Sequence, residues 1–207
     1  MYPEILTHPN IPKPLHGLNP RTIKGKEWWD IERSVAYARD NYHCTACFTP
    51  ASKAKYFQYL EAHELYKYDL YNYTLTFVEA VALCHSCHNF IHSGRMWALY
   101  EKDQITKAKI TDILKHGFIV LKRHNLKPFI GTQVINLKLK GKSNEEIIKK
   151  LKLKDSDLVD DIDTWNKWRL IIDGVEYEGN FKNFNEWETY YSNHYQLKEM
   201  ELIVNIK

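Results

Sequence analysis

The segment Leu83-Cys-His-Ser-Cys-His-Asn-Phe-Ile-His-Ser-Gly-Arg95, together with Cys44-Thr-Ala-Cys47 upstream of it, decides the fold of this chain. Its two C-x-x-C pairs contain all four cysteines of the 207 residues. Four thiols at this spacing are typical of a structural Zn²⁺ site, because zinc prefers tetrahedral sulfur ligands and four ligands leave no position open for a substrate. The alternatives are a redox-active C-x-x-C and buried free thiols. The expected zinc ligands are Cys44, Cys47, Cys84 and Cys87.

Residues on either side of the second cysteine pair predict a strand pair followed by a short helix. β-rich residues dominate the stretch before Cys84 and are broken near residues 69–72. This pattern predicts a two-stranded ribbon, with one strand ending near His63 and the other at Leu83. The residues after Cys87 predict the opening of a helix.

Four side chains of these predicted elements could form one chemical site. On a strand, Glu61 and His63 point to the same face, because side chains alternate. On a helix, His88 and His92 are four residues apart and share a face, which suits binding of one metal ion. Since the two cysteine pairs bracket the ribbon and adjoin the helix, we expect the zinc site to bring His63 against His88 and His92.

This combination of C-x-x-C, a strand histidine, and C-x-x-C-H with a further histidine resembles the zinc-bearing HNH endonucleases of the ββα-metal fold. The likeness covers about residues 27–100 and extends to uncharacterised HNH-like proteins of phages and bacteria. It implies a zinc-stapled ββα module, a catalytic Mg²⁺ or Mn²⁺, and DNA as the partner. In the family the strand histidine activates water, and a helix histidine holds the divalent ion at the scissile phosphate. Carried over, His63 is the base, His88 the metal ligand, and His92 an extra ligand or phosphate contact.

Two positions differ from the family pattern. The residue before the base, usually an acidic or histidine ligand, is Ala62, and Glu79 stands near the place of the middle asparagine. Glu61 is the candidate for the missing carboxylate, and Asn72 for a displaced structural asparagine. The alternative role for the histidines is packing or hydrogen bonding around the zinc ligands. The remaining histidines follow no pattern and are expected to be solvated: His8, His16, His43, His85, His116, His124 and His194.

Helices are predicted on both sides of this module. Residues 1–25 carry five of the seven prolines and predict an extended arm. A helix is predicted over Glu27–Asp40 and another over Thr106–Leu126. Trp28, Ile31, Val35 and Ala38 would form one face of the first. The second would bury Ile110, Ile113, Leu114, Gly117, Val120 and Leu121.

The C-terminal part predicts a small mixed unit. Ser143-Asn-Glu-Glu146 is a capping box, Asp173-Gly174 marks a hairpin turn, and a last helix is expected from Asn185. A second helix over Asp155–Asp163 would give a helix-turn-helix outline, but its aspartates would be repelled by DNA, which favours a scaffold role. We therefore expect an α+β chain with one domain over residues 1–126 and a second over residues 127–207.

Composition limits the function classes. The net charge is only +3, with +4 in residues 1–126 and −1 in residues 127–207, so any polyanion contact belongs in the first part. No apolar run is long enough for a membrane span and no signal peptide is visible, so we expect a cytoplasmic protein. The first hypothesis is an HNH-like nuclease of phage or mobile-element type. The alternatives are an eroded HNH-like protein that binds nucleic acid or a host or phage protein, in anti-defence or assembly, and a zinc-stabilised interaction module.

Overall fold

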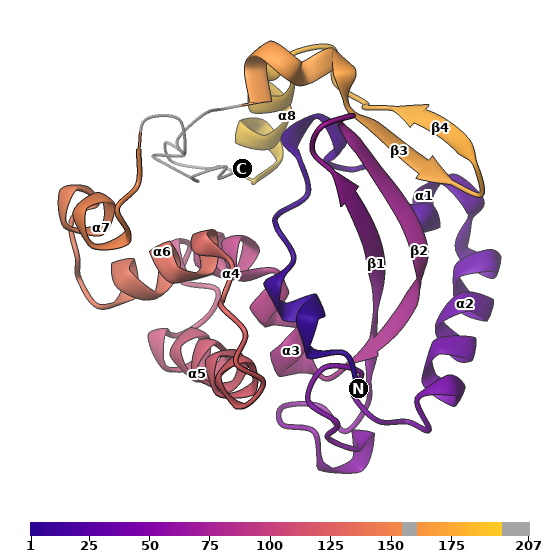
Figure 1. Ribbon diagram of the computed structural model, residues 1–207, viewed down its shortest axis with the longest axis vertical. Helices are drawn as coiled ribbons and strands as arrows, with labels where there is room; N and C mark the ends of the chain where they lie inside the picture. Colours follow the sequence, from indigo (N-terminus) through magenta and orange to yellow (C-terminus); the bar gives the residue numbers. More distant parts are fainter. Residues whose placement is uncertain (155–160, 196–207) are drawn as a thin grey trace.

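A four-stranded sheet runs through the computed structural model, which describes residues 1–154 and 161–195 (Figure 1). Strands β1 (Glu61–Asp69) and β2 (Thr74–Leu83) form a long antiparallel hairpin. Strand β3 (Arg169–Ile172) adds in parallel to β2, and β4 (Val175–Glu178) pairs antiparallel with β3. The α+β class expected from the sequence is confirmed.

Helices lie on both sides of the hairpin, with α2 on one side and α3 to α7 on the other (Figure 1). None of the helices in the described part of the chain is long and apolar enough to cross a membrane. The helices are α1 (Pro20–Lys24), α2 (Lys26–Arg39), α3 (His85–Ile91), α4 (Ser93–Glu101), α5 (Lys107–Arg123), α6 (Ile130–Leu139), α7 (Asn144–Leu151) and α8 (Phe184–Tyr195).

The hairpin differs from its prediction at one end. β1 begins at Glu61 and passes through His63, so the expectation of a strand ending near His63 is wrong. The strand continues because Tyr66 and Tyr68 keep it rich in β-forming residues, and Tyr66 is buried in a cluster with β2 and β3. Strand reversal occurs after Asp69, whose carboxylate accepts two backbone N–H bonds of the turn, at the break expected near residues 69–72.

Helix α2 forms as predicted but buries a different face. Trp29 and Ala36 pack against Ala80 of β2, whereas Ile31 and Val35 are 63% and 55% exposed. The expected face is therefore wrong. Trp29 points toward the sheet in place of Ile31 and Val35. The guanidinium of Arg39 donates to the Ala80 carbonyl at 3.0 Å, and this bond fixes the rotation of the helix about its axis.

Helix α5 matches its prediction closely. All six apolar or small residues expected on its inner face are buried, and the Thr106 side chain accepts a hydrogen bond from the Lys109 amide as an N-cap. Gly117 allows α3 to approach closely, because a Cβ at this position would lie 2.1 Å from the Phe90 ring. The contact between α3 and α5 is the centre of the main core.

The N-terminal arm is packed, so the expectation of an extended segment is wrong. It contains short 3-10 helices at Pro3–Thr7 and Lys13–Leu15. Ile5 and Leu6 are buried in the main core, where the first 3-10 helix covers α3 and α5. Burial of these two apolar side chains favours the packed arm.

The C-terminal part contains the predicted capping box at Ser143 and the predicted turn at Asp173-Gly174, where both residues have positive φ. Helix α8 begins one residue before Asn185. Most of the helix expected over residues 155–163 lies outside the described residues. The parts of the chain before and after residue 126 are joined in one sheet by the pairing of β2 with β3. They also share the main core, which includes Ile135 of α6.

Candidate metal centres and the adjoining pocket

The four cysteines lie together, as the sequence predicts. Their sulfur atoms are all within 4.8 Å of one another, so they could bind a metal ion such as zinc. Two thiolates bound to one tetrahedral zinc, each about 2.3 Å from the ion, would be separated by about 3.8 Å. The Sγ atoms of Cys47 and Cys84 are 3.8 Å apart. The cluster therefore has the dimensions of a four-sulfur zinc site.

The first cysteine pair reaches the second because its loop is attached to the end of β2. The backbone N–H of Thr45 donates to the Ala82 carbonyl at 2.7 Å, and its hydroxyl accepts from the Ala82 amide. The second pair flanks the start of α3, where Cys84 is the N-cap residue. This places all four sulfurs at the junction of β2 and α3.

A histidine of α5 completes the surroundings of the sulfurs. His116 Nε2 lies 3.4 Å from the Sγ of Cys87. Hydrogen bonds to Cys47 and Cys84 raise the pKa of His116 to about 9, which favours a positive charge beside the thiolates. The expectation that His116 is solvated is therefore wrong, because α5 packs its face onto α3.

A second cluster is formed by three histidines from the strand and the helix. One nitrogen of each of His63, His88 and His92 lies within 4.8 Å of the others. The ring centroids are separated by 4.8 to 5.4 Å. The strand histidine thus meets His88 of α3 and His92, which caps the end of α3, and the three side chains could hold a metal ion.

Glu61 orients the cluster from one side. Its carboxylate accepts hydrogen bonds from Nδ1 of His88 and from Nδ1 of His85, the latter at 2.7 Å. Burial raises the pKa of Glu61, but the bonds from His88 and His85 outweigh it and bring the pKa to about 2. With Nδ1–H bonded to a carboxylate, the His88 Nε2 lone pair is free for a metal, an arrangement common around metal-binding histidines. The expectation that His85 is solvated is wrong, because Glu61 and the ring of Phe57 contact it.

Two of the three histidines are held in the neutral form that metal binding needs. Burial lowers the pKa of His63 well below its ordinary value, with smaller contributions from His92 and His88. Burial, with smaller contributions from His88 and Arg95, lowers the pKa of His92 to about 3. A neutral imidazole keeps a lone pair for a metal or a proton.

Asn72 and Glu79 do not join this site. Asn72 lies in the β1–β2 turn, exposed, and its side-chain amide donates to Asp69 at 2.8 Å. The antiparallel register pairs Glu61 with Leu83 at the opposite end of β1, so Asn72 lies away from the histidines, and its role as a displaced structural asparagine stays a prediction. Glu79 forms an ion pair with Arg39 of α2.

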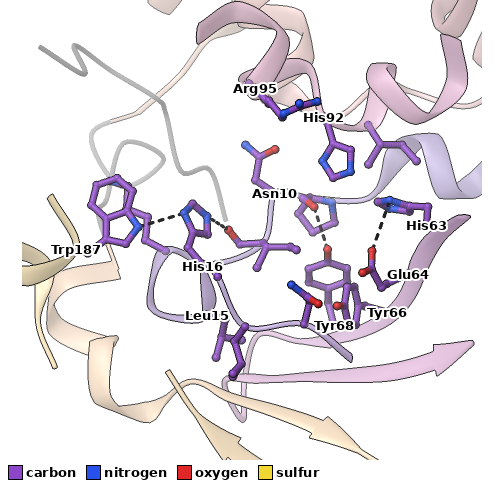
Figure 2. Close-up of a pocket in the computed structure, with 18 residues that line it drawn as sticks. Asn10, Leu15, His16, His63, Glu64, Tyr66, Tyr68, His92, Arg95 and Trp187 are labelled. Carbon is purple, nitrogen blue, oxygen red and sulfur yellow. Dashed lines mark hydrogen bonds and ion pairs between the residues drawn. The ribbon is translucent and has the colours of Figure 1, made fainter. Parts of the chain in front are cut away.

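A pocket of about 400 Å³ adjoins the histidine cluster (Figure 2). His63 and His92 line one end of it, the arm residues 9–19 form one wall, and β1 forms another. His16 fixes the arm: its Nε2–H donates to the Ile11 carbonyl at 2.9 Å, and its Nδ1 accepts from the indole N–H of Trp187 in α8 at 3.1 Å. His16 is therefore a structural histidine and not a solvated one.

Sequence reasoning missed the β1 side chains that line this pocket. Glu64, Tyr66 and Tyr68 are two residues apart along β1 and so share one face of the strand. All three line the pocket that His63 also lines. Burial raises the pKa of Glu64 above its ordinary value. Glu64 beside His63 is the one feature of the sequence that could have indicated this pocket, since a carboxylate next to a candidate base is unusual on a buried strand.

The fold and the sites define a mixed α+β protein with a four-cysteine cluster able to bind a metal, beside a cluster of three histidines. Comparison with known protein families, curated proteins and solved structures finds no match to the chain.

Proposed function

We propose that the chain is an HNH-like, metal-dependent nuclease that hydrolyses phosphodiester bonds in DNA, with the four cysteines holding a structural zinc. The observation that carries the proposal is the cluster of His63, His88 and His92 with its orienting carboxylate, Glu61. In this proposal two protein ligands, His88 and His92, leave coordination positions for water and a phosphate oxygen, as in catalytic metal sites.

Each residue of the cluster has a separate task in this proposal. A bound divalent ion would neutralise negative charge that develops on the phosphate and on the leaving oxygen. His88 and His92 hold the ion, and Glu61 keeps the His88 ring in the tautomer that offers Nε2. His63 is neutral and accepts a proton from the attacking water. Its Nδ1 is buried, has no hydrogen-bond partner among the described residues, and lies 3.9 Å from the Glu64 carboxylate.

The direct test is nicking of supercoiled plasmid DNA in the presence of Mn²⁺ or Mg²⁺. We expect His63→Ala to abolish nicking while zinc content and the unfolding temperature remain those of the wild type. His124→Ala is the matched control, because this histidine is exposed at the end of α5 and far along the chain from the cluster. Wild-type protein that nicks no DNA with either ion, while folded and zinc-loaded, would contradict the proposal.

A second candidate function is DNA or protein binding by an eroded HNH-like protein in anti-defence or assembly. It is favoured by the ligand chemistry, because Mg²⁺ prefers oxygen ligands and this cluster offers imidazoles alone. Ala62 removes the usual additional ligand. DNA binding that weakens steeply with salt, without cleavage by any divalent ion, would support this function. Absence of DNA binding would leave a zinc-stabilised interaction module.

A further inference from the structure

We infer that the pocket beside the three histidines receives one unpaired nucleotide, so that the substrate is single-stranded DNA and not intact duplex. The inference rests on the proposed function for the reaction and adds the substrate class. It depends on three features of the pocket: unpartnered buried polar atoms, an apolar and aromatic wall, and a bounded volume.

The unpartnered atoms point to a missing ligand. The Tyr66 hydroxyl is buried without a hydrogen-bond partner among the described residues, and the whole residue is 4% exposed. His63 Nδ1 is also buried without a hydrogen-bond partner among the described residues, in a residue that is 5% exposed, although the Glu64 carboxylate lies 3.9 Å away. Both residues line the same pocket. Buried polar groups in native proteins are nearly always hydrogen-bonded, so two such atoms in residues that line one pocket support a polar ligand there.

The remaining wall suits a nucleobase. Ile11 of the arm and Tyr68 of β1 supply apolar and aromatic surface, with Leu15 buried behind it, and Trp187 lies at one end (Figure 2). Glu64 lines the same pocket as the two tyrosines. Unpaired bases are recognised in this way, by apolar and aromatic contact on their faces and hydrogen bonds along their edges.

The other end of the pocket suits the attached phosphate. His63 and His92 line it, and Arg95 of α4 lies beside His92 (Figure 2). A guanidinium at this position can pair with phosphate oxygens. A nucleotide with its base against Tyr66 would therefore place its phosphate beside His63 and His92.

The size of the pocket suits one nucleotide. Its 400 Å³ lies in the range of about 300–1,000 Å³ found for small-molecule sites. A single DNA-binding module covers about 600–1,000 Å² of protein surface on duplex DNA, which needs an open face. Here the arm covers β1, and the hydrogen bond between His16 and Trp187 ties that cover to α8.

Binding is tested with the full zinc-loaded protein and no added divalent ion. The probes are a short fluorescein-labelled single-stranded DNA and the same strand annealed to its complement, measured by fluorescence anisotropy. We expect the single strand to bind at least about tenfold more tightly, because the duplex must first unpair and unstack a nucleotide. Tyr66→Phe removes only the hydroxyl and should weaken single-strand binding about fivefold, as expected for the loss of one hydrogen bond.

Tyr71→Phe is the matched control, because Tyr71 is 89% exposed in the β1–β2 turn. It should leave binding unchanged. Equal or tighter binding of the duplex, no binding of either probe, or an unchanged affinity in Tyr66→Phe would overturn the inference. Mn²⁺-dependent cleavage of the same two probes tests the proposed function separately. No cleavage with single-strand preference intact refutes the nuclease and keeps the pocket assignment, whereas equal cleavage of both probes refutes the pocket assignment alone.

Discussion

Replacing Glu61 by glutamine should weaken metal binding at the three-histidine cluster. The carboxylate accepts from His88 and from His85, whereas a glutamine side chain has one carbonyl oxygen and an NH₂ group. The NH₂ group would face an Nδ1–H, so one of the two hydrogen bonds is lost. The ring of His88 is then free to turn its Nε2 away from His63 and His92.

The magnitude follows from the type of bond removed. A hydrogen bond to a charged group contributes about 1.5–3 kcal/mol, and removal of a partner that orients a metal-binding histidine lowers affinity about 10–100-fold. We therefore expect the dissociation constant for Mn²⁺ to rise about 10–100-fold in Glu61→Gln. Folding should be retained, because the Glu61 side chain is 21% exposed at the edge of the site.

The assay is titration of zinc-loaded protein with Mn²⁺, followed by the loss of the free-ion electron paramagnetic resonance signal. Glu79→Gln is the matched control, since Glu79 is also a half-buried strand glutamate but pairs with Arg39 on the α2 side. It should bind Mn²⁺ as the wild type does. Equal Mn²⁺ affinity in Glu61→Gln and the wild type would refute the orienting role of this carboxylate.

Three further predictions test the residues that support the two metal clusters and the pocket. Gly117→Ala should destabilise the protein by about 1–3 kcal/mol in urea unfolding, because the added Cβ would collide with the Phe90 ring. Most glycine-to-alanine changes in helices are stabilising, so an unchanged unfolding midpoint would contradict this packing. His116→Gln should lower zinc affinity about tenfold in competition with a chromophoric chelator, since it removes the positive partner of the thiolates, and equal zinc retention would exclude that role. Burial lowers the pKa of His16 from 6.5 to about 4. As pH falls, the unfolded chain therefore takes up a proton before the folded one, and up to about 3 kcal/mol of stability is lost between these two pH values. Urea unfolding at about pH 7.5 and about pH 4.5 should show a smaller loss in His16→Gln than in the wild type. An identical pH dependence in both proteins would contradict the buried, neutral state of His16.

The metal clusters could be predicted from the sequence because their spacing is local. Each C-x-x-C pair forms within one turn of chain, and His88 and His92 are one helical turn apart. Strand alternation placed Glu61 and His63 on one face. The remaining condition, that the two cysteine pairs meet, follows from the tetrahedral preference of zinc.

The pocket and the rotation of α2 could not be predicted in this way. The pocket depends on the N-terminal arm that forms one of its walls and on a hydrogen bond between His16 and Trp187, which are 171 positions apart in the chain. The inner face of α2 is chosen by Trp29 and by Arg39 bonding to Ala80, and not by the most continuous apolar stripe. Such choices depend on tertiary contacts that periodicity does not encode.

The most direct test of the account is an anomalous-scattering experiment on crystals of the zinc-loaded protein soaked in Mn²⁺. The account predicts a zinc peak among the four cysteine sulfurs and a separate manganese peak in contact with imidazole nitrogens of His88 and His92, beside His63. A manganese peak elsewhere, or none at full zinc occupancy, would contradict a catalytic metal site in this protein.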